Sequence, residues 1–139
     1  MQSIRIIEKL YEAFSDAPPP KHLGGCSLGC CMSAEDGKKI LSQPLRQADP
    51  EILWYYTEDA IWTIGSKTDF KYFTPRLLEL GLSDYDRDGT KQGFIAFPET
   101  FGKKLELAGF ESWSDEQCLA VDDAIFEICL LYTSPSPRD

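Results

Sequence analysis

The sequence SDEQCLAVDDAIFEI occupies residues 114–128 and has the clearest helical pattern in the chain. Ser114 and Gln117 stand three residues apart at its start, as in a capping box, in which each side chain binds the other residue's backbone N–H. Apolar residues then recur every three or four positions, which is the period of one helix face. They are Cys118, Val121, Ile125 and Ile128. We therefore predict a helix that begins after Ser114 and presents this apolar stripe to a core.

The same period recurs upstream and predicts further helices. The expected segments are 4–14, 34–43, 50–64 with Gly65 as its stop, 66–81 and 98–108. The first of them carries the stripe Ile4, Ile7, Tyr11 and Phe14. Asp49 and Pro50 mark a clear helix start, because Asp caps a helix and Pro fits its first turn. Pro75 interrupts the fourth segment, where we expect a kink or a division. No strand alternates convincingly, so we predict an all-α, single-domain bundle of five to seven short helices.

Residues 129–139, CLLYTSPSPRD, break this pattern. They resemble the translation of a transposase-type sequencing adapter. The Ser/Pro run from Thr133 to Pro137 also stops any helix, since proline lacks an N–H and restricts the residue before it. The alternative is a genuine disordered C-terminus, because Ser/Pro-rich ends are common. We expect one helical domain over residues 1–128, truncated at its C-terminus, and a non-native tail over 129–139.

Composition excludes several classes of function. The formal net charge of −9 argues against nonspecific binding to nucleic acid or to an anionic membrane, both of which favour clustered positive charge. No apolar run approaches the roughly 20 residues needed to cross a bilayer. Glu8 and Glu12 interrupt the N-terminal segment, which therefore lacks the apolar core of a signal peptide. We expect a cytoplasmic protein whose thiols stay reduced.

A cluster of soft ligands lies in the segment 22–31. His22, Cys26, Cys30 and Cys31 supply one imidazole and three thiols, which are the ligands of tetrahedral zinc. The spacing is irregular and contains no CxxC knuckle, so the pattern discriminates weakly. The alternative is that these are reduced cysteines packed as small apolar side chains. The metal prediction is a structural zinc ion held by the 22–31 loop.

Two other chemical interpretations use loop residues. Cys30 or Cys31 is a candidate nucleophile with His22 as its base, and Cys31 lies just before the expected helix start at Ser33, where a helix dipole favours thiolate. In the polar segment 82–93, Asp84, Asp86, Asp88 and Gly89 match the opening of a calcium loop. Ile95 stands where such a loop needs a bidentate Glu, so a solvated acidic loop is the favoured interpretation.

Aromatic residues gather between positions 54 and 73, mostly at core spacing. Any aromatic side chain left on the outer side of a helix would form an interaction patch. We take Asp69, Tyr72 and Arg76 as candidate binding residues. A structural salt bridge from Arg76 to Glu79 or Asp69 is the alternative for that arginine.

Three segments resemble an uncharacterised family of small bacterial proteins. They are HLGGCSLGCC at 22–31, PLRQADPEILWYYTEDAIWTIG at 44–65 and DFKYFTPRLLEL at 69–80. The resemblance runs from about Ile4 to about Gln117. It implies a bacterial, all-α, single-domain protein and leaves the function open. The chain departs from the family pattern at Thr74, where an apolar residue is usual, and in a longer gap between Cys26 and Cys30.

These observations favour a non-enzymatic domain that acts through a protein partner, with zinc as its only expected cofactor. The alternatives are a thiol-dependent enzyme or redox protein that uses Cys30 or Cys31, and an acidic immunity or inhibitor protein with a basic partner. The last interpretation rests on net charge alone.

Overall fold

The computed structural model describes residues 2–21, 23, 34–59, 67–82 and 98–133, and every regular element in them is helical. The all-α prediction is confirmed. In chain order the elements are α1 (Gln2–Ala13), α2 (Ala34–Ser42), the 3-10 turn η1 (Leu45–Gln47), α3 (Pro50–Asp59), α4 (Lys67–Leu82), α5 (Pro98–Leu107), the 3-10 turn η2 (Phe110–Ser112) and α6 (Asp115–Thr133).

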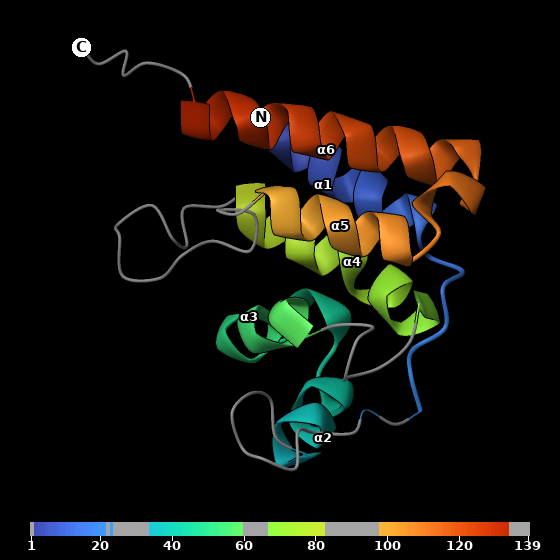
Figure 1. Ribbon diagram of the computed structural model, residues 1–139, viewed down its shortest axis with the longest axis vertical. Coiled ribbons are helices and arrows are strands. Elements are labelled where there is room, and N and C mark those ends of the chain that lie inside the picture. The colour runs from blue at the N-terminus through green and yellow to red at the C-terminus, as the bar shows by residue number, and fades with distance from the viewer. Residues whose placement is uncertain (1, 22, 24–33, 60–66, 83–97, 134–139) are drawn as a thin grey trace.

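The helices form successive tiers (Figure 1). α1 and α6 lie together at one end, and both pack on α4. α5 lies beside α4 in the middle of the molecule and contacts α3. α2 packs on α3 at the other end. The outer face of the α1 and α6 pair is therefore far from α2.

The predicted helix caps are present in atomic detail. The Ser114 N–H donates to Gln117 Oε1, and the Gln117 N–H donates to Ser114 Oγ, both at 3.1 Å. Asp49 Oδ1 accepts the N–H groups of Glu51 at 2.8 Å and Ile52 at 3.3 Å. These bonds satisfy backbone donors that the first helical turn leaves without partners. Gly109 ends α5 at a φ of 79°, which an L side chain rarely adopts.

Aromatic side chains of α3, α4 and α5 form the centre of the core. Tyr56, Phe70, Phe73 and Phe101 are almost fully buried. The rings of Tyr56 and Phe73 lie 5.1 Å apart, and those of Phe70 and Phe101 lie 5.8 Å apart. Each such side chain stabilises the fold by roughly 1.5–3 kcal/mol through burial. The helical periodicity of the sequence therefore located the centre of the core correctly.

Two helices differ from expectation. In α1, Ile4 is 62% exposed, and Ile6, Leu10 and Ala13 are buried. Phe14, which directly follows α1, is buried as predicted. The buried face is rotated from the predicted stripe because α4 and α6 pack on α1 together. In α4, Pro75 lies inside one continuous helix, so the predicted division there is wrong. Packing on the core holds the helix together, since Pro75 and its neighbours on both sides are buried or half-buried.

Gly37 lies inside α2, where glycine weakens a helix by roughly 1 kcal/mol relative to alanine. The structure supplies the reason for it. A Cβ atom at position 37 would lie 2.7 Å from the Leu23 carbonyl oxygen. Leu23 is itself buried. The missing side chain lets the backbone next to His22 approach α2 closely.

α6 continues through residues 129–133, beyond the predicted domain boundary at Ile128. It ends at Thr133, where the Ser/Pro run begins. Ile128 is buried, whereas Cys129 and Leu130 are exposed. Cys129 and Leu130 therefore lie outside the core.

Candidate functional site

The large apolar side chains that the described fold leaves exposed lie on α1 and α6. Leu119 is 63% exposed, Phe126 is 66% exposed, and Ile4 and Leu130 are exposed too. Leu119, Asp123 and Phe126 follow one another at i, i+4 and i+7, so they form a single stripe along the outside of α6. We call these three residues the α6 stripe. Leu130 continues the stripe within the adapter-like segment.

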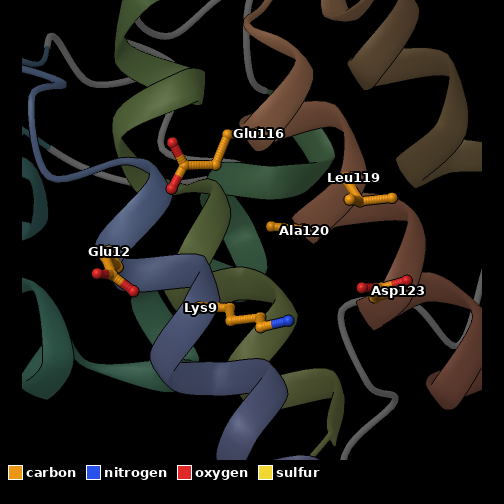
Figure 2. Close-up of a pocket in the computed structure, with 6 residues that line it drawn as sticks. All are labelled: Lys9, Glu12, Glu116, Leu119, Ala120 and Asp123. Atoms are coloured by element: carbon orange, nitrogen blue, oxygen red, sulfur yellow. The ribbon is translucent and has the colours of Figure 1, made fainter.

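A groove runs between α1 and α6 beside this stripe. One hollow of about 250 Å³ is lined by Lys9, Glu12, Glu116, Leu119, Ala120 and Asp123 (Figure 2). A second hollow of about 410 Å³ is lined by Arg5, Ile6, Lys9, Asp123, Phe126, Glu127 and Leu130. Because Lys9 and Asp123 line both hollows, the two hollows are adjacent, and together we call them the α1/α6 groove. Figure 2 shows Lys9 reaching from α1 toward α6.

Charge is distributed unequally across the groove. α6 carries five acidic residues and no Lys, Arg or His. They are Asp115, Glu116, Asp122, Asp123 and Glu127. Within the described part of the chain, none of these carboxylates forms an ion pair. Burial, Asp122 and Asp115 together raise the pKa of the Cys118 thiol, as the local negative potential requires. The α6 side of the groove is an anionic surface without compensating charge in its own helix.

The α1 side is mixed in charge. Arg5 and Lys9 line the groove, and Glu12 lines it further along α1. Across both hollows, two cationic side chains therefore face the carboxylates of Glu12, Glu116, Asp123 and Glu127. The exposed Leu119 and Phe126 therefore lie beside a groove whose α6 side is acidic and whose α1 side is mixed in charge. No group of three metal-ligating side chains occurs in the residues that the structure describes.

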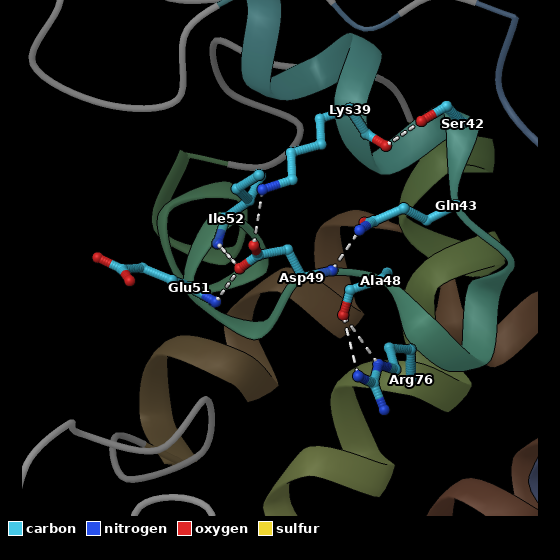
Figure 3. Close-up of polar contacts among 8 residues, drawn as sticks. All are labelled: Lys39, Ser42, Gln43, Ala48, Asp49, Glu51, Ile52 and Arg76. Atoms are coloured by element: carbon cyan, nitrogen blue, oxygen red, sulfur yellow. Dashed lines mark hydrogen bonds and ion pairs between the residues drawn. The ribbon is translucent and has the colours of Figure 1, made fainter.

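Arg76 lies on α4 and is engaged within the molecule. Its Nε and Nη2 donate to the Ala48 carbonyl oxygen at 3.2 and 3.0 Å (Figure 3). Its Nη1 pairs with Glu79 Oε1 at 3.1 Å, and its side chain is only 12% exposed. The predicted salt bridge to Glu79 is present. These contacts fasten the chain between η1 and α3 to α4.

The same Glu79 oxygen accepts a hydrogen bond from the Tyr11 hydroxyl of α1. Burial raises the pKa of Tyr11, and the hydrogen bond to Glu79 raises it further. Arg46 lies over the Tyr11 ring, with its guanidinium carbon 3.9 Å from the centroid, and forms a bidentate pair with Glu8 at 3.0 and 3.1 Å. This cluster joins α1, η1 and α4, because its polar side chains bind one another across these elements.

The other two candidate binding residues also lie on α4. Asp69 and Tyr72 are half-buried. Asp69, Tyr72 and Arg76 are spaced by three and then four residues, so all three lie on one side of α4. The Tyr72 ring packs edge-on against Phe73, with centroids 5.0 Å apart. Buried Tyr56 has no hydrogen-bond partner for its hydroxyl in the described structure. Burial raises the Tyr56 pKa, and the charge of Asp69 adds to the effect.

The predicted metal ligands His22, Cys26, Cys30 and Cys31 lie outside the described residues, as do the acidic loop residues Asp84, Asp86 and Asp88. The structural zinc ion of the 22–31 loop stays a prediction. The described cysteines are Cys118, which is half-buried, and Cys129, which is exposed.

Sequence reasoning did not identify the α1/α6 groove, although a signal for it was present. Leu119 and Phe126 are apolar but fall outside the predicted core stripe of α6. An apolar residue on the acidic side of a helix is unusual where that side faces only water. Weighing the exposed side of the helix as carefully as its core side would have found the stripe.

Comparisons with protein-family models, with curated proteins and with solved structures find no match for this chain. Among the described residues, no helix is both long and apolar enough to span a bilayer.

Proposed function

We propose that this chain is a non-enzymatic protein-interaction domain whose α1/α6 groove receives an amphipathic helix from a partner protein. One observation carries the proposal. Leu119 and Phe126 remain about two-thirds exposed on a helix whose other side is buried in the core. Leaving such side chains in water costs free energy that a partner's apolar face would recover.

The shape of the site favours a helix as the bound element. Two packed helices present a channel parallel to their axes, and a third helix fits such a channel by packing its side chains into it. Leu119 and Phe126 are seven residues apart, about 10 Å along the helix. A bound helix would meet both through side chains at i, i+3 or i+4, and i+7. An exposed Phe at the centre of such a contact is a typical energetic anchor.

The fold does not depend on these two side chains. Both are mostly exposed in the free domain, so replacing them with serine removes little buried apolar area. The double variant Leu119→Ser/Phe126→Ser should therefore keep its thermal midpoint and lose only the binding surface. This separation of binding from folding makes the proposal testable.

A displayed library of helical peptides, with a fixed apolar stripe and randomised flanking residues, tests the proposal when panned against the full chain. We expect binders that lose affinity by at least about tenfold for Leu119→Ser/Phe126→Ser, because both anchors are removed. The matched control is Glu111→Ser, an exposed substitution in η2, which should bind normally. A library that yields no binders, or binders that the double variant retains, would overturn the proposed function.

A further inference from the structure

We further propose that the partner helix is basic, with Lys and Arg residues on the flank that lies over α6; this inference rests on the proposed function of the α1/α6 groove. Five acidic residues of α6 account for more than half of the chain's formal net charge of −9. Glu116, Asp123 and Glu127 line the groove itself. α6 contributes no positive charge to this surface, and Arg5 and Lys9 of α1 offset only part of the negative charge, so a partner with Lys and Arg residues would complement it.

The position of these carboxylates supports a role beyond helix stability. Acidic residues stabilise the first turn of a helix through its dipole, as Asp115 and Glu116 do here. Asp122, Asp123 and Glu127 lie further along α6, where the dipole no longer favours them. No Lys or Arg stands four residues away in α6 to pair with them. Their mutual repulsion is relieved when an opposite charge approaches from outside.

The same distribution disfavours a second copy of this chain as the occupant. A symmetric pairing of two α6 stripes would bring both sets of five carboxylates together without an intervening cation. Like charges facing each other across an interface cost binding free energy. Arg5 and Lys9 of the two copies would supply four positive charges against ten α6 carboxylates, so they would offset only part of this repulsion. Charge complementarity therefore selects a different molecule with a basic helix.

Two matched helical peptides of about 18 residues test this inference with the full chain. Both carry the same apolar stripe, and their flanks are either Lys and Arg or Glu. We expect the basic peptide to bind at least about tenfold more tightly at low salt, and the difference to shrink as salt rises. Asp123→Lys should weaken the basic peptide by about fivefold. Glu35→Lys on α2 makes the same charge change far from the groove and should leave binding unchanged.

The possible outcomes distinguish failure of the basic-partner inference from failure of the helix-binding groove. Equal affinity for both peptides, each lost in Leu119→Ser/Phe126→Ser, would overturn the basic partner and leave the helix-binding groove standing. Binding of neither peptide would contradict the proposed function itself. A stable dimer of the free chain in analytical ultracentrifugation, dissociated by Leu119→Ser/Phe126→Ser, would also overturn the inference, because a second copy would then occupy the groove.

Discussion

Replacing Arg76 with alanine is expected to lower the free energy of unfolding by about 3 kcal/mol, because one partner of a mostly buried polar cluster is removed. The Ala48 carbonyl would lose both of its donors from Arg76. Glu79 would still accept the hydrogen bond from the Tyr11 hydroxyl, but it would lose the positively charged guanidinium of Arg76 that pairs with it. Chemical denaturation followed by circular dichroism measures the change.

The matched control is Arg46→Ala. Arg46 also contacts Tyr11 and a carboxylate, but its side chain is 46% exposed and its pair with Glu8 lies at the surface. Water screens exposed pairs, so a clearly smaller loss is expected for this variant. Equal losses for the two arginines would show that burial of the Arg76 cluster does not determine its contribution.

The substitution Gln117→Glu is expected to lower the free energy of unfolding by about 2 kcal/mol at neutral pH, although local preferences favour it. A glutamate would still accept the Ser114 N–H. It would lose the donor that Gln117 Nε2 presents to the Ala13 carbonyl at 3.1 Å. Because Gln117 is only 3% exposed, a carboxylate would instead be buried against that carbonyl oxygen.

The pH dependence of this variant follows from the same contact. Burial of the new carboxylate raises its pKa in the folded state above the unfolded value of about 4.3. The protonated form can donate to the Ala13 carbonyl, so the penalty is present at neutral pH and declines as the pH falls toward 4.3. Chemical denaturation of the variant and of the wild type, at neutral pH and near pH 4.3, measures this change in the penalty. Gln47→Glu makes the same substitution at an exposed position and should carry no comparable penalty at either pH. A pH-independent penalty in Gln117→Glu would contradict the account.

The sequence predicted those parts of the fold that depend on local chemistry. Two helix starts were predicted correctly because capping contacts act within one turn of the helix. They are marked by Ser114 with Gln117 and by Asp49 with Pro50. The α4 stripe around Phe70 and Phe73 was readable because its period matches a helix throughout. The division considered at Pro75 was wrong because burial on both sides holds α4 together, which a local pattern does not reveal. The kink considered there stays a prediction.

Tertiary contacts explain what the sequence could not provide. The rotation of α1 that exposes Ile4 is set by α4 and α6 packing on it together. The hydrogen bond from Gln117 Nε2 to the Ala13 carbonyl joins residues far apart in the sequence, so no local pattern predicts it. The α1/α6 groove depends on the same helix pairing. The negative charge of the groove could be predicted from the α6 sequence alone. That Arg5 and Lys9 lie beside it is known only from the packing of α1 on α6.

The measurement that tests the central claim most directly is the amide chemical-shift map of the full chain during titration with the basic helical peptide. The account predicts that the largest changes fall on the α1 and α6 residues of the groove, including Lys9, Leu119 and Asp123, and that they disappear in Leu119→Ser/Phe126→Ser. Changes centred on α2 to α4 that leave α1 and α6 unaffected, or no changes at saturating peptide, would contradict it.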